Sequence, residues 1–178
     1  MLAVFSGAAV AQTGMEPGNT GKSDWELEQE KRAWREADAP LPPPPGTGEL
    51  LPFFVSSASD LRFFIDAASL APSTDGVVRY ALIVRSPLGA ETVSYEGIRC
   101  STGEVKTYAY GRADRTWSVR PRGAWRRIET RSVQRWHDAL WREYFCPREI
   151  PIRNAAEGIY ALKRGGHPAS GATPPRGY

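Results

Sequence analysis

The chain has 178 residues, a formal net charge of +3 and 41% apolar residues, and 11% of its residues are aromatic. This length fits a single domain, and the apolar content is sufficient for a buried core. No run approaches the roughly 18 consecutive apolar residues that a membrane-spanning helix requires, so the sequence contains no transmembrane segment.

The first residues have the character of a secretion signal. Residues 1–11 form an apolar run that closes on Ala9-Val10-Ala11, the small-x-small pattern of signal peptidase sites. The positively charged start of a complete signal peptide is missing, so we expect a truncated signal peptide cleaved after Ala11. The alternative is a frayed apolar N-terminus. The signal predicts a soluble periplasmic or secreted protein. A lipid anchor is not expected, because no cysteine lies near the predicted cleavage site.

Residues 12–48 are expected to be a flexible leader that holds a surface helix and a proline-rich linker. The helix covers Asp24 to Ala37, where acidic residues precede basic ones, as the helix dipole favours. Leu41 to Gly48 contains four consecutive prolines, which favour polyproline II. Such a segment can bind an aromatic-lined groove of another protein, but it is more often a stiff linker.

Residues 49–163 are predicted to be the folded domain, and five strands are expected within it. Two short strands cover 50–55 and 62–70, and three longer ones cover 77–86, 91–99 and 104–110. Apolar and polar residues alternate in the longer strands with many β-branched and aromatic side chains, as is typical of strands. Short turns join the three longer strands, so they must pair as an antiparallel meander.

The strand at 77–86 is expected to lie at the centre of the sheet. One of its faces carries Val78, Tyr80 and Leu82, and the other carries Ala81 and Ile83. Because both faces are apolar at the middle of the strand, we expect both to be covered.

Helices are predicted near the end of the chain. From Ser132, apolar residues follow the helical spacing up to Cys146, with Ser132 as N-cap and Pro147 as the stop. A second short helix is expected from Asn154 to Lys163. Residues 164–178 are rich in Gly and Pro and are expected to form a disordered tail. The predicted fold is therefore α+β: a single domain in which an antiparallel β-meander of about five strands packs against a C-terminal helix.

The two cysteines, Cys100 and Cys146, predict one disulfide in an exported chain. A catalytic cysteine is the alternative, and it would need an activating base. The histidines are His137, beside tryptophans on the predicted helix, and His167 in the tail, so nothing marks either thiol as activated.

Several strings of residues resemble the CNP1-like family of proteobacterial envelope proteins. They are DGVVRYALIVRS, VSYEGIRC, YAYGR, a Trp-rich basic segment and a helix that ends in EYFC, and they lie within Trp34 to Pro147. The resemblance implies an exported domain of unknown function and supports the cysteine pair. It brings no catalytic residues to carry over.

A row of aromatic and basic side chains is the candidate binding face. Tyr108, Tyr110 and Lys106 have the strand spacing that places them on one side of the sheet. Such a row can stack on bases or sugars, or recognise an acidic partner. The alternative is that the tyrosines pack against the helix at Trp136 and Leu140. The candidate residues are Tyr95, Tyr108, Tyr110, Arg112, Trp117 and Trp125.

Residues 112–142 suggest a second function. They contain nine arginines against three acidic residues, and tryptophans lie between the arginines. This pattern predicts binding to a polyanion or a nucleic acid. Export argues against nucleic acid as the physiological partner, whereas an envelope protein, anionic lipid or polysaccharide remains open.

Catalysis and metal binding receive little support. Two histidines, two cysteines and scattered acids show no zinc or calcium ligand spacing, and no cofactor motif is present. Glu96 and Asp66 could act as acid and base if they met in a cleft. A glutamate in a strand is more often exposed or paired with arginine. We therefore expect a non-enzymatic binding or structural module of the cell envelope.

Overall fold

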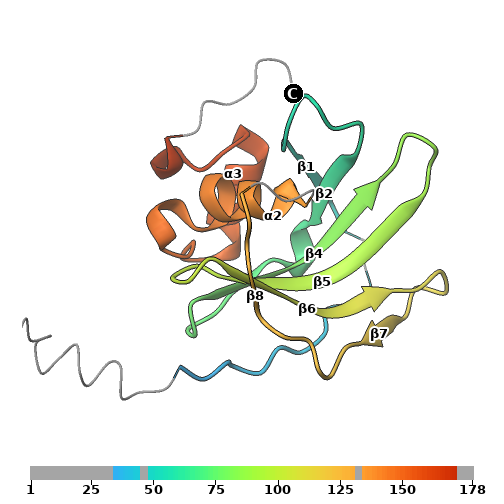
Figure 1. The fold of residues 1–178 in the computed structure, drawn as a ribbon, viewed down its shortest axis with the longest axis horizontal. Helices are drawn as coiled ribbons and strands as arrows, with labels where there is room; N and C mark the ends of the chain where they lie inside the picture. Colours follow the sequence, from blue (N-terminus) through green and yellow to red (C-terminus); the bar gives the residue numbers. More distant parts are fainter. Residues whose placement is uncertain (1–33, 45–47, 131–133, 172–178) are drawn as a thin grey trace, which may run out of the picture. The chain divides into compact units, whose positions relative to one another are not determined.

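The computed structural model describes residues 34–44, 48–130 and 134–171. The described fold belongs to a compact unit that begins at Glu36. It is α+β, with an antiparallel sheet and C-terminal helices (Figure 1). It contains one disulfide, and together these features confirm the predicted fold class. The predicted signal peptide, the N-cap Ser132 and most of the predicted surface helix lie outside the described residues. No described helix is both long and apolar enough to span a membrane.

The sheet contains the five predicted strands and three short additional ones. Its main path is β1-β2-β4-β5-β6-β7, and every pairing is antiparallel. These strands are Leu50–Phe53, Arg62–Asp66, Val77–Arg85, Glu91–Arg99, Glu104–Gly111 and Trp117–Val119. Beside this path, β3 (Ala71–Pro72) pairs with β4 and β8 (Arg126–Arg127) pairs with β6.

Strand β2 is shorter than the sequence predicts because Asp66 starts a new element. The Asp66 side chain accepts a hydrogen bond from the Ala68 amide at 3.0 Å and caps the 3-10 helix η1, Ala67–Ser69. The Asp66 carboxylate thus binds a backbone amide that would pair with a neighbouring strand if β2 continued. The chain therefore leaves the sheet at Asp66.

Strand β4 is central, as predicted. Its first seven residues, 77–83, are all buried. Tyr80 packs against Phe145 of the helical layer, with ring centroids 5.3 Å apart, which places its face of the sheet toward the helices. Arg79 and Ala81 point to the opposite side, here called the outer face, since neighbouring strand residues alternate.

The predicted C-terminal helix is built in two parts. Helix α2, Arg135–Ala139, continues into the π-helical segment η2, Leu140–Phe145. The Cys146 amide donates to the Trp141 carbonyl at 2.9 Å, which is the five-residue spacing of a π turn. The 3-10 turn η3, Pro147–Glu149, follows.

Helix α3, Ala155–Arg164, matches the second predicted helix. The Asn154 side chain accepts from the Glu157 amide at 2.9 Å as N-cap, and Gly165 ends the helix in the left-handed conformation at φ 78°. The following residues, expected to be disordered, are described as far as Gly171 and contain the 3-10 turn η4, Pro168–Ser170. In Figure 1, α2 and α3 gather on the same side of the sheet.

The disulfide joins the two layers of the domain. Cys100 follows β5 and Cys146 follows η2, they are 46 residues apart, and both are buried. They belong to one core cluster together with Tyr80, Leu140 and Phe145. The predicted bridge is therefore confirmed, and it ties the end of a central strand to the helical layer.

Candidate functional site

Most of the predicted aromatic face is covered by the chain itself. A segment at residues 36–44, here called the N-terminal strap, contacts the outer face of the sheet. Trp117 Nε1 donates to the carbonyl of Pro42 at 2.7 Å. Tyr108 Oη donates to Glu36 Oε1 at 2.7 Å, and Trp125 Nε1 donates to Glu36 Oε2 at 3.2 Å. The strap lies in the stretch for which a leader and linker were expected, and none of its residues is helical.

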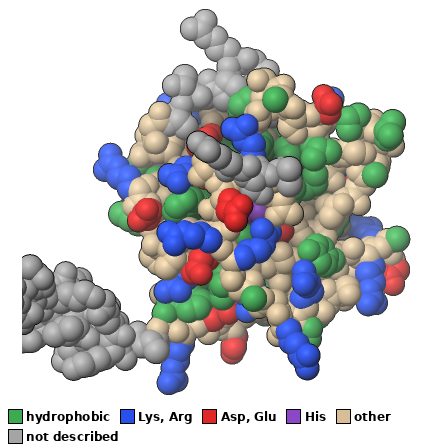
Figure 2. Space-filling view, viewed as in Figure 1, with side chains coloured by type: hydrophobic (Ala, Val, Ile, Leu, Met, Phe, Trp, Pro, Cys, Tyr) green, Lys and Arg blue, Asp and Glu red, His purple; other side chains and the backbone are tan. Residues whose placement is uncertain are grey.

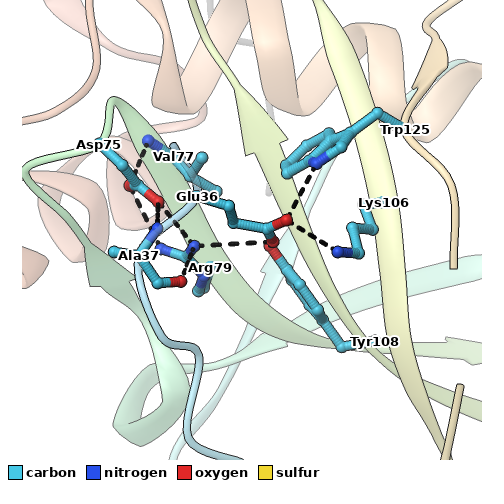
Figure 3. A network of polar contacts seen from close by, with 8 residues as sticks. All are labelled: Glu36, Ala37, Asp75, Val77, Arg79, Lys106, Tyr108 and Trp125. Atoms are coloured by element: carbon cyan, nitrogen blue, oxygen red, sulfur yellow. Dashed lines mark hydrogen bonds and ion pairs between the residues drawn. The ribbon is translucent and has the colours of Figure 1, made fainter. Parts of the chain in front are cut away.

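Glu36 is the centre of a polar network on the outer face (Figure 3). Besides the two aromatic donors, Lys106 Nζ lies 2.8 Å from Glu36 Oε2. Burial raises the pKa of Glu36, but the hydrogen bonds from Lys106, Tyr108 and Trp125 outweigh it, so the net pKa is lowered. The carboxylate is therefore held in its charged form by donors from strand β6 and the segment that follows it.

The strap is also attached through the buried Arg79. Its Nη2 donates to Asp75 Oδ2 at 2.7 Å and to the Ala37 carbonyl at 3.1 Å. The Ala37 amide in turn donates to Asp75 Oδ2 at 2.8 Å. Burial opposes the charged form of Asp75, but the donors Arg79, Ala37 and Val77 lower its net pKa. The buried arginine, paired closely with Asp75 and at 3.9 Å with Glu36 Oε1, thus fixes the backbone of the strap.

A β-bulge in β6 places Tyr108 and Tyr110 on opposite faces of the sheet, although their spacing in the sequence predicted one common face. Tyr95 pairs with Ala109 and Glu96 pairs with Thr107, so Tyr108 is an extra residue in β6. Tyr108 consequently lies on the outer face with Lys106 and Glu36. Tyr110, opposite Ser94, lies on the helical side. The predicted common orientation of Tyr108 and Tyr110 is wrong, because alternation assumes an uninterrupted ladder.

The structure therefore does not join the six candidate residues into one exposed surface. Tyr95 is buried, with its ring centroid 5.4 Å from that of Tyr108 and 6.1 Å from that of Trp117. Arg112 is exposed and donates to Ser118 at 3.3 Å. The aromatic residues of the outer face pack beneath the strap, and not against the helix at Trp136 and Leu140 as the packing alternative expected.

On the helical side, a groove of about 370 Å³ lies between β4–β6 and the start of α2. We call it the Glu96 groove. One part of its lining is apolar, and the rest carries hydroxyl, amide, carboxylate, imidazole and guanidinium groups. The lining side chains include those of Leu82, Thr92, Glu96, Thr107, Tyr110, Arg126, Gln134, Trp136 and His137.

The groove contains a buried acid and a buried imidazole in contact. Glu96 Oε2 lies 2.7 Å from His137 Nε2, and the side chains are 6% and 4% exposed. Ser94 Oγ donates to Glu96 Oε1 at 2.9 Å, and Tyr80 Oη donates to Oε2 at 3.4 Å. Burial and the adjacent Glu96 carboxylate raise the pKa of Tyr80 well above its ordinary value, so the phenol stays protonated and remains a donor.

This arrangement differs from a catalytic triad. In a Ser-His-acid triad the histidine lies between the hydroxyl and the carboxylate and takes the proton of the nucleophile. Here the carboxylate of Glu96 lies between Ser94 and His137. Asp66, the other acid considered from the sequence, caps η1 instead of joining Glu96. Among the described residues, no group of three His, Cys, Asp or Glu side chains could hold a metal ion.

A larger hollow, of about 590 Å³, lies along β1 and the end of α3. Its charged side chains are exposed and engaged: Lys163 lies 3.0 Å from Glu49, and Arg164 donates to Tyr160 at 3.2 Å. No buried charged side chain lines it within the described ranges. The Glu96 groove is the better candidate because convergent buried polar groups mark ligand sites more reliably than volume.

Sequence reasoning misjudged the environment of Glu96, which was expected to be exposed or paired with arginine, and it gave His137 no role. A signal was present in the hairpin, because Arg85 pairs with Glu91 across the turn. That register places Glu96 opposite Tyr80 of the central strand, both faces of which were predicted to be covered. The contact with His137 depends on tertiary packing.

Comparisons with known proteins show which family the folded domain resembles. The chain is 27% identical over 127 residues to "Cryptic neisserial protein 1" of Neisseria gonorrhoeae (strain ATCC 700825 / FA 1090). The match covers 63% of this chain and spans 63% of the length of that relative. No solved structure matches the chain. The family model of the CNP1-like family matches residues 29–163, which include the strap, the sheet, both helices and the disulfide. The chain therefore belongs to the CNP1-like family.

Proposed function

We propose that this protein is exported to the periplasm and acts there as a non-enzymatic binding module of the cell envelope, with the Glu96 groove as its ligand site. The observation that carries the binding role is the buried Glu96–His137 contact in an open groove. Burying a carboxylate costs free energy unless it is fully hydrogen-bonded. Because of this cost, buried ionisable groups that line a concave site indicate a functional site.

The disulfide supports the proposed compartment. Disulfides persist in oxidising compartments such as the periplasm and are rare in the cytosol. Cys100 and Cys146 are both buried in the core, so their bridge is part of the fold and not an exposed regulatory pair. The family resemblance to exported proteins points in the same direction.

The polar groups of the groove support binding over catalysis. Ser94 donates its hydroxyl hydrogen to the Glu96 carboxylate, which is also hydrogen-bonded to His137, and the described residues that line the groove include no cysteine or lysine that could act as a nucleophile. Their hydrogen-bonding groups are suited to orienting a ligand.

Export is tested by expressing the protein with a complete export signal and separating the periplasm from the cytosol. We expect the intact protein in the periplasmic fraction, resistant to thiol alkylation and lighter than its reduced form by two hydrogen atoms. Recovery in the cytosol with two alkylated cysteines would overturn the proposal for the compartment.

Polyanion binding is the second candidate function, and the exposure of the arginines favours it. Arg112, Arg115, Arg120, Arg122, Arg126 and Arg127 are all exposed. On the face drawn in Figure 2, however, Lys and Arg side chains are scattered among Asp and Glu. If the protein binds polyanions through these arginines, its affinity for heparin should fall steeply as the salt concentration rises. Absence of heparin binding at low salt would exclude it.

A further inference from the structure

The hydrogen-bonding capacity of the Glu96 groove indicates its ligand, and this step rests on the proposed binding function. We propose that the groove binds a neutral glycan, whose hydroxyls bond to Glu96, His137 and the threonines of β5 and β6 while a sugar face packs on Trp136. The geometry, charge and chemistry of the lining each support this class of ligand.

The buried acid has one acceptor site left. A carboxylate offers about four lone-pair sites. Ser94, Tyr80 and His137 occupy three of those on Glu96. The fourth site can accept one hydroxyl donor without removing any of the existing partners.

His137 adds a second acceptor. When Nε2 carries the hydrogen that Glu96 accepts, the other nitrogen of the neutral ring, Nδ1, is an acceptor. No hydrogen-bond partner of Nδ1 is found within the part of the chain that the structure describes. In this tautomer, His137 and Glu96 together provide two acceptors that a polyhydroxyl ligand can satisfy.

Further groups of the lining can both donate and accept. Thr92 on β5 and Thr107 on β6 line the groove, and neither hydroxyl has a partner among the described residues. Gln134 and Arg126 line it as well, and Arg126 Nη2 donates to Gln134 Oε1 at 2.8 Å. A mixture of hydroxyl, amide and guanidinium groups matches the alternating donors and acceptors of sugar hydroxyls.

An aromatic side chain supplies the apolar contact that a sugar ring needs. Trp136 lines the groove, and its ring is supported by Phe63 at a centroid distance of 5.5 Å. Tyr110, 40% exposed, also lines it from β6. Aromatic rings bind the apolar faces of ligands while polar groups nearby fix the orientation.

The charges favour a neutral ligand over a charged one. The Glu96 carboxylate disfavours an anion close to it, since like charges at a site of low dielectric repel strongly. Arg126 in the same lining disfavours a cation. The volume of about 370 Å³ lies at the lower end of the range for small-ligand sites, about 300–1,000 Å³, and suits one or a few sugar units.

The experiment uses the oxidised full chain and three neutral glycans: chitohexaose, maltohexaose and dextran. Binding is measured by calorimetry, and the site is mapped by amide chemical shifts. We expect at least one glycan to bind with an affinity that does not depend on the salt concentration, and to shift the amide resonances of groove residues.

Thr107→Val and Thr92→Val should each weaken binding about three- to tenfold, since each removes one hydrogen bond at nearly constant shape. Thr74→Val, outside the groove, is the matched control and should leave affinity unchanged.

Each contrary outcome has a distinct meaning. If none of the three glycans binds while a cationic amine, a short peptide or heparin shifts groove residues, the glycan assignment fails and the binding function stands. If a glycan binds but both threonine variants retain full affinity, the site is elsewhere on the domain and the assignment also fails. If no member of this panel shifts the groove, both the glycan assignment and the proposed binding function are overturned.

Discussion

Tyr108 Oη donates a hydrogen bond to Glu36 Oε1 at 2.7 Å, although the two residues are 72 positions apart in the sequence. The contact exists because a β-bulge turns Tyr108 to the outer face of the sheet, where the strap crosses. Burial and the acceptor Glu36 raise the pKa of Tyr108 far above its ordinary value, so the phenol remains a donor at any physiological pH. The strap is therefore part of the folded domain.

Glu36→Gln should destabilise the domain by about 1–2 kcal/mol. The amide loses the charge that attracts Lys106 and can no longer accept from all three donors. Urea unfolding followed by tryptophan fluorescence measures the change. Glu91→Gln is the matched control, because its pair with Arg85 is about 42% exposed and should contribute less than about 1 kcal/mol. Equal effects of the two substitutions would contradict a structural role for the strap.

Acid should weaken the contribution of the strap to the stability of the domain. The pKa values of Glu36 and Asp75 are lowered in the folded state from ordinary values of 4.5 and 3.8. A lowered pKa stabilises the fold above the ordinary value, and this contribution disappears as the pH falls through the folded-state pKa. Unfolding free energy measured from about pH 6 to about pH 3 should therefore decline below about pH 4.5.

Glu36→Gln provides the control for this pH dependence. The variant lacks one of the two titrating carboxylates, so its decline should be shallower than that of the parent. A decline of identical slope in both proteins would show that Glu36 does not contribute to acid unfolding.

Removing the disulfide should cost several kcal/mol. The double variant Cys100→Ser/Cys146→Ser releases a closed loop between residues 46 positions apart, for which the chain-entropy model gives about 4 kcal/mol. Denaturant unfolding of the oxidised parent and the variant measures the difference. Under a strong reductant the two proteins should unfold at nearly the same denaturant concentration. If they already coincide under oxidising conditions, the bridge contributes nothing to stability.

Glu96→Ala should be among the most damaging substitutions in the domain. It leaves His137, Ser94 and Tyr80 without their common acceptor in a buried site, and breaking such a buried polar cluster costs about 3–5 kcal/mol. Glu96→Gln retains an acceptor and should cost less. Glu104→Ala, whose side chain is 29% exposed, is the control and should cost about 1 kcal/mol. A cost for Glu96→Ala no larger than that of the control would be inconsistent with the buried contact.

Gly97→Ala tests how closely the strands pack on the outer face. An added Cβ would lie 2.9 Å from Val77 Cγ1 and 3.0 Å from the Tyr108 hydroxyl. Overpacking of this kind costs about 1–3 kcal/mol. Combining it with Val77→Ala should give a smaller loss of unfolding free energy than the sum of the two single losses, because the second change opens the space that the first one needs. Simple additivity would show that the strands adjust without strain.

The sequence predicted the features that depend on local pattern. Alternation along 77–86 identified a central strand, and Asn154 marked the start of the last helix, because strand alternation and N-caps act within a few residues. The pair of cysteines predicted the bridge, since an exported chain with two cysteines has one pairing available.

The candidate site depended on contacts that no local pattern contains. One extra residue in β6 reversed the orientation of Tyr110 relative to Tyr108, and a bulge is decided by the pairing of whole strands. In the strap, Glu36 and Ala37 were expected to end a surface helix, and the residues from Leu41 were expected to form a proline-rich linker. The strap is held instead by donors about 70 positions away.

The sequence by itself therefore determined the strand order of the meander, the C-terminal helices, the disulfide and the family. Tertiary structure alone decided which side chains became partners: Glu36 with Lys106 and Tyr108, and Glu96 with His137. The physical reason is that hydrophobic alternation and capping are short-range and repeat along the chain. A buried charge, in contrast, selects whichever donor the packing of distant elements brings within hydrogen-bonding distance.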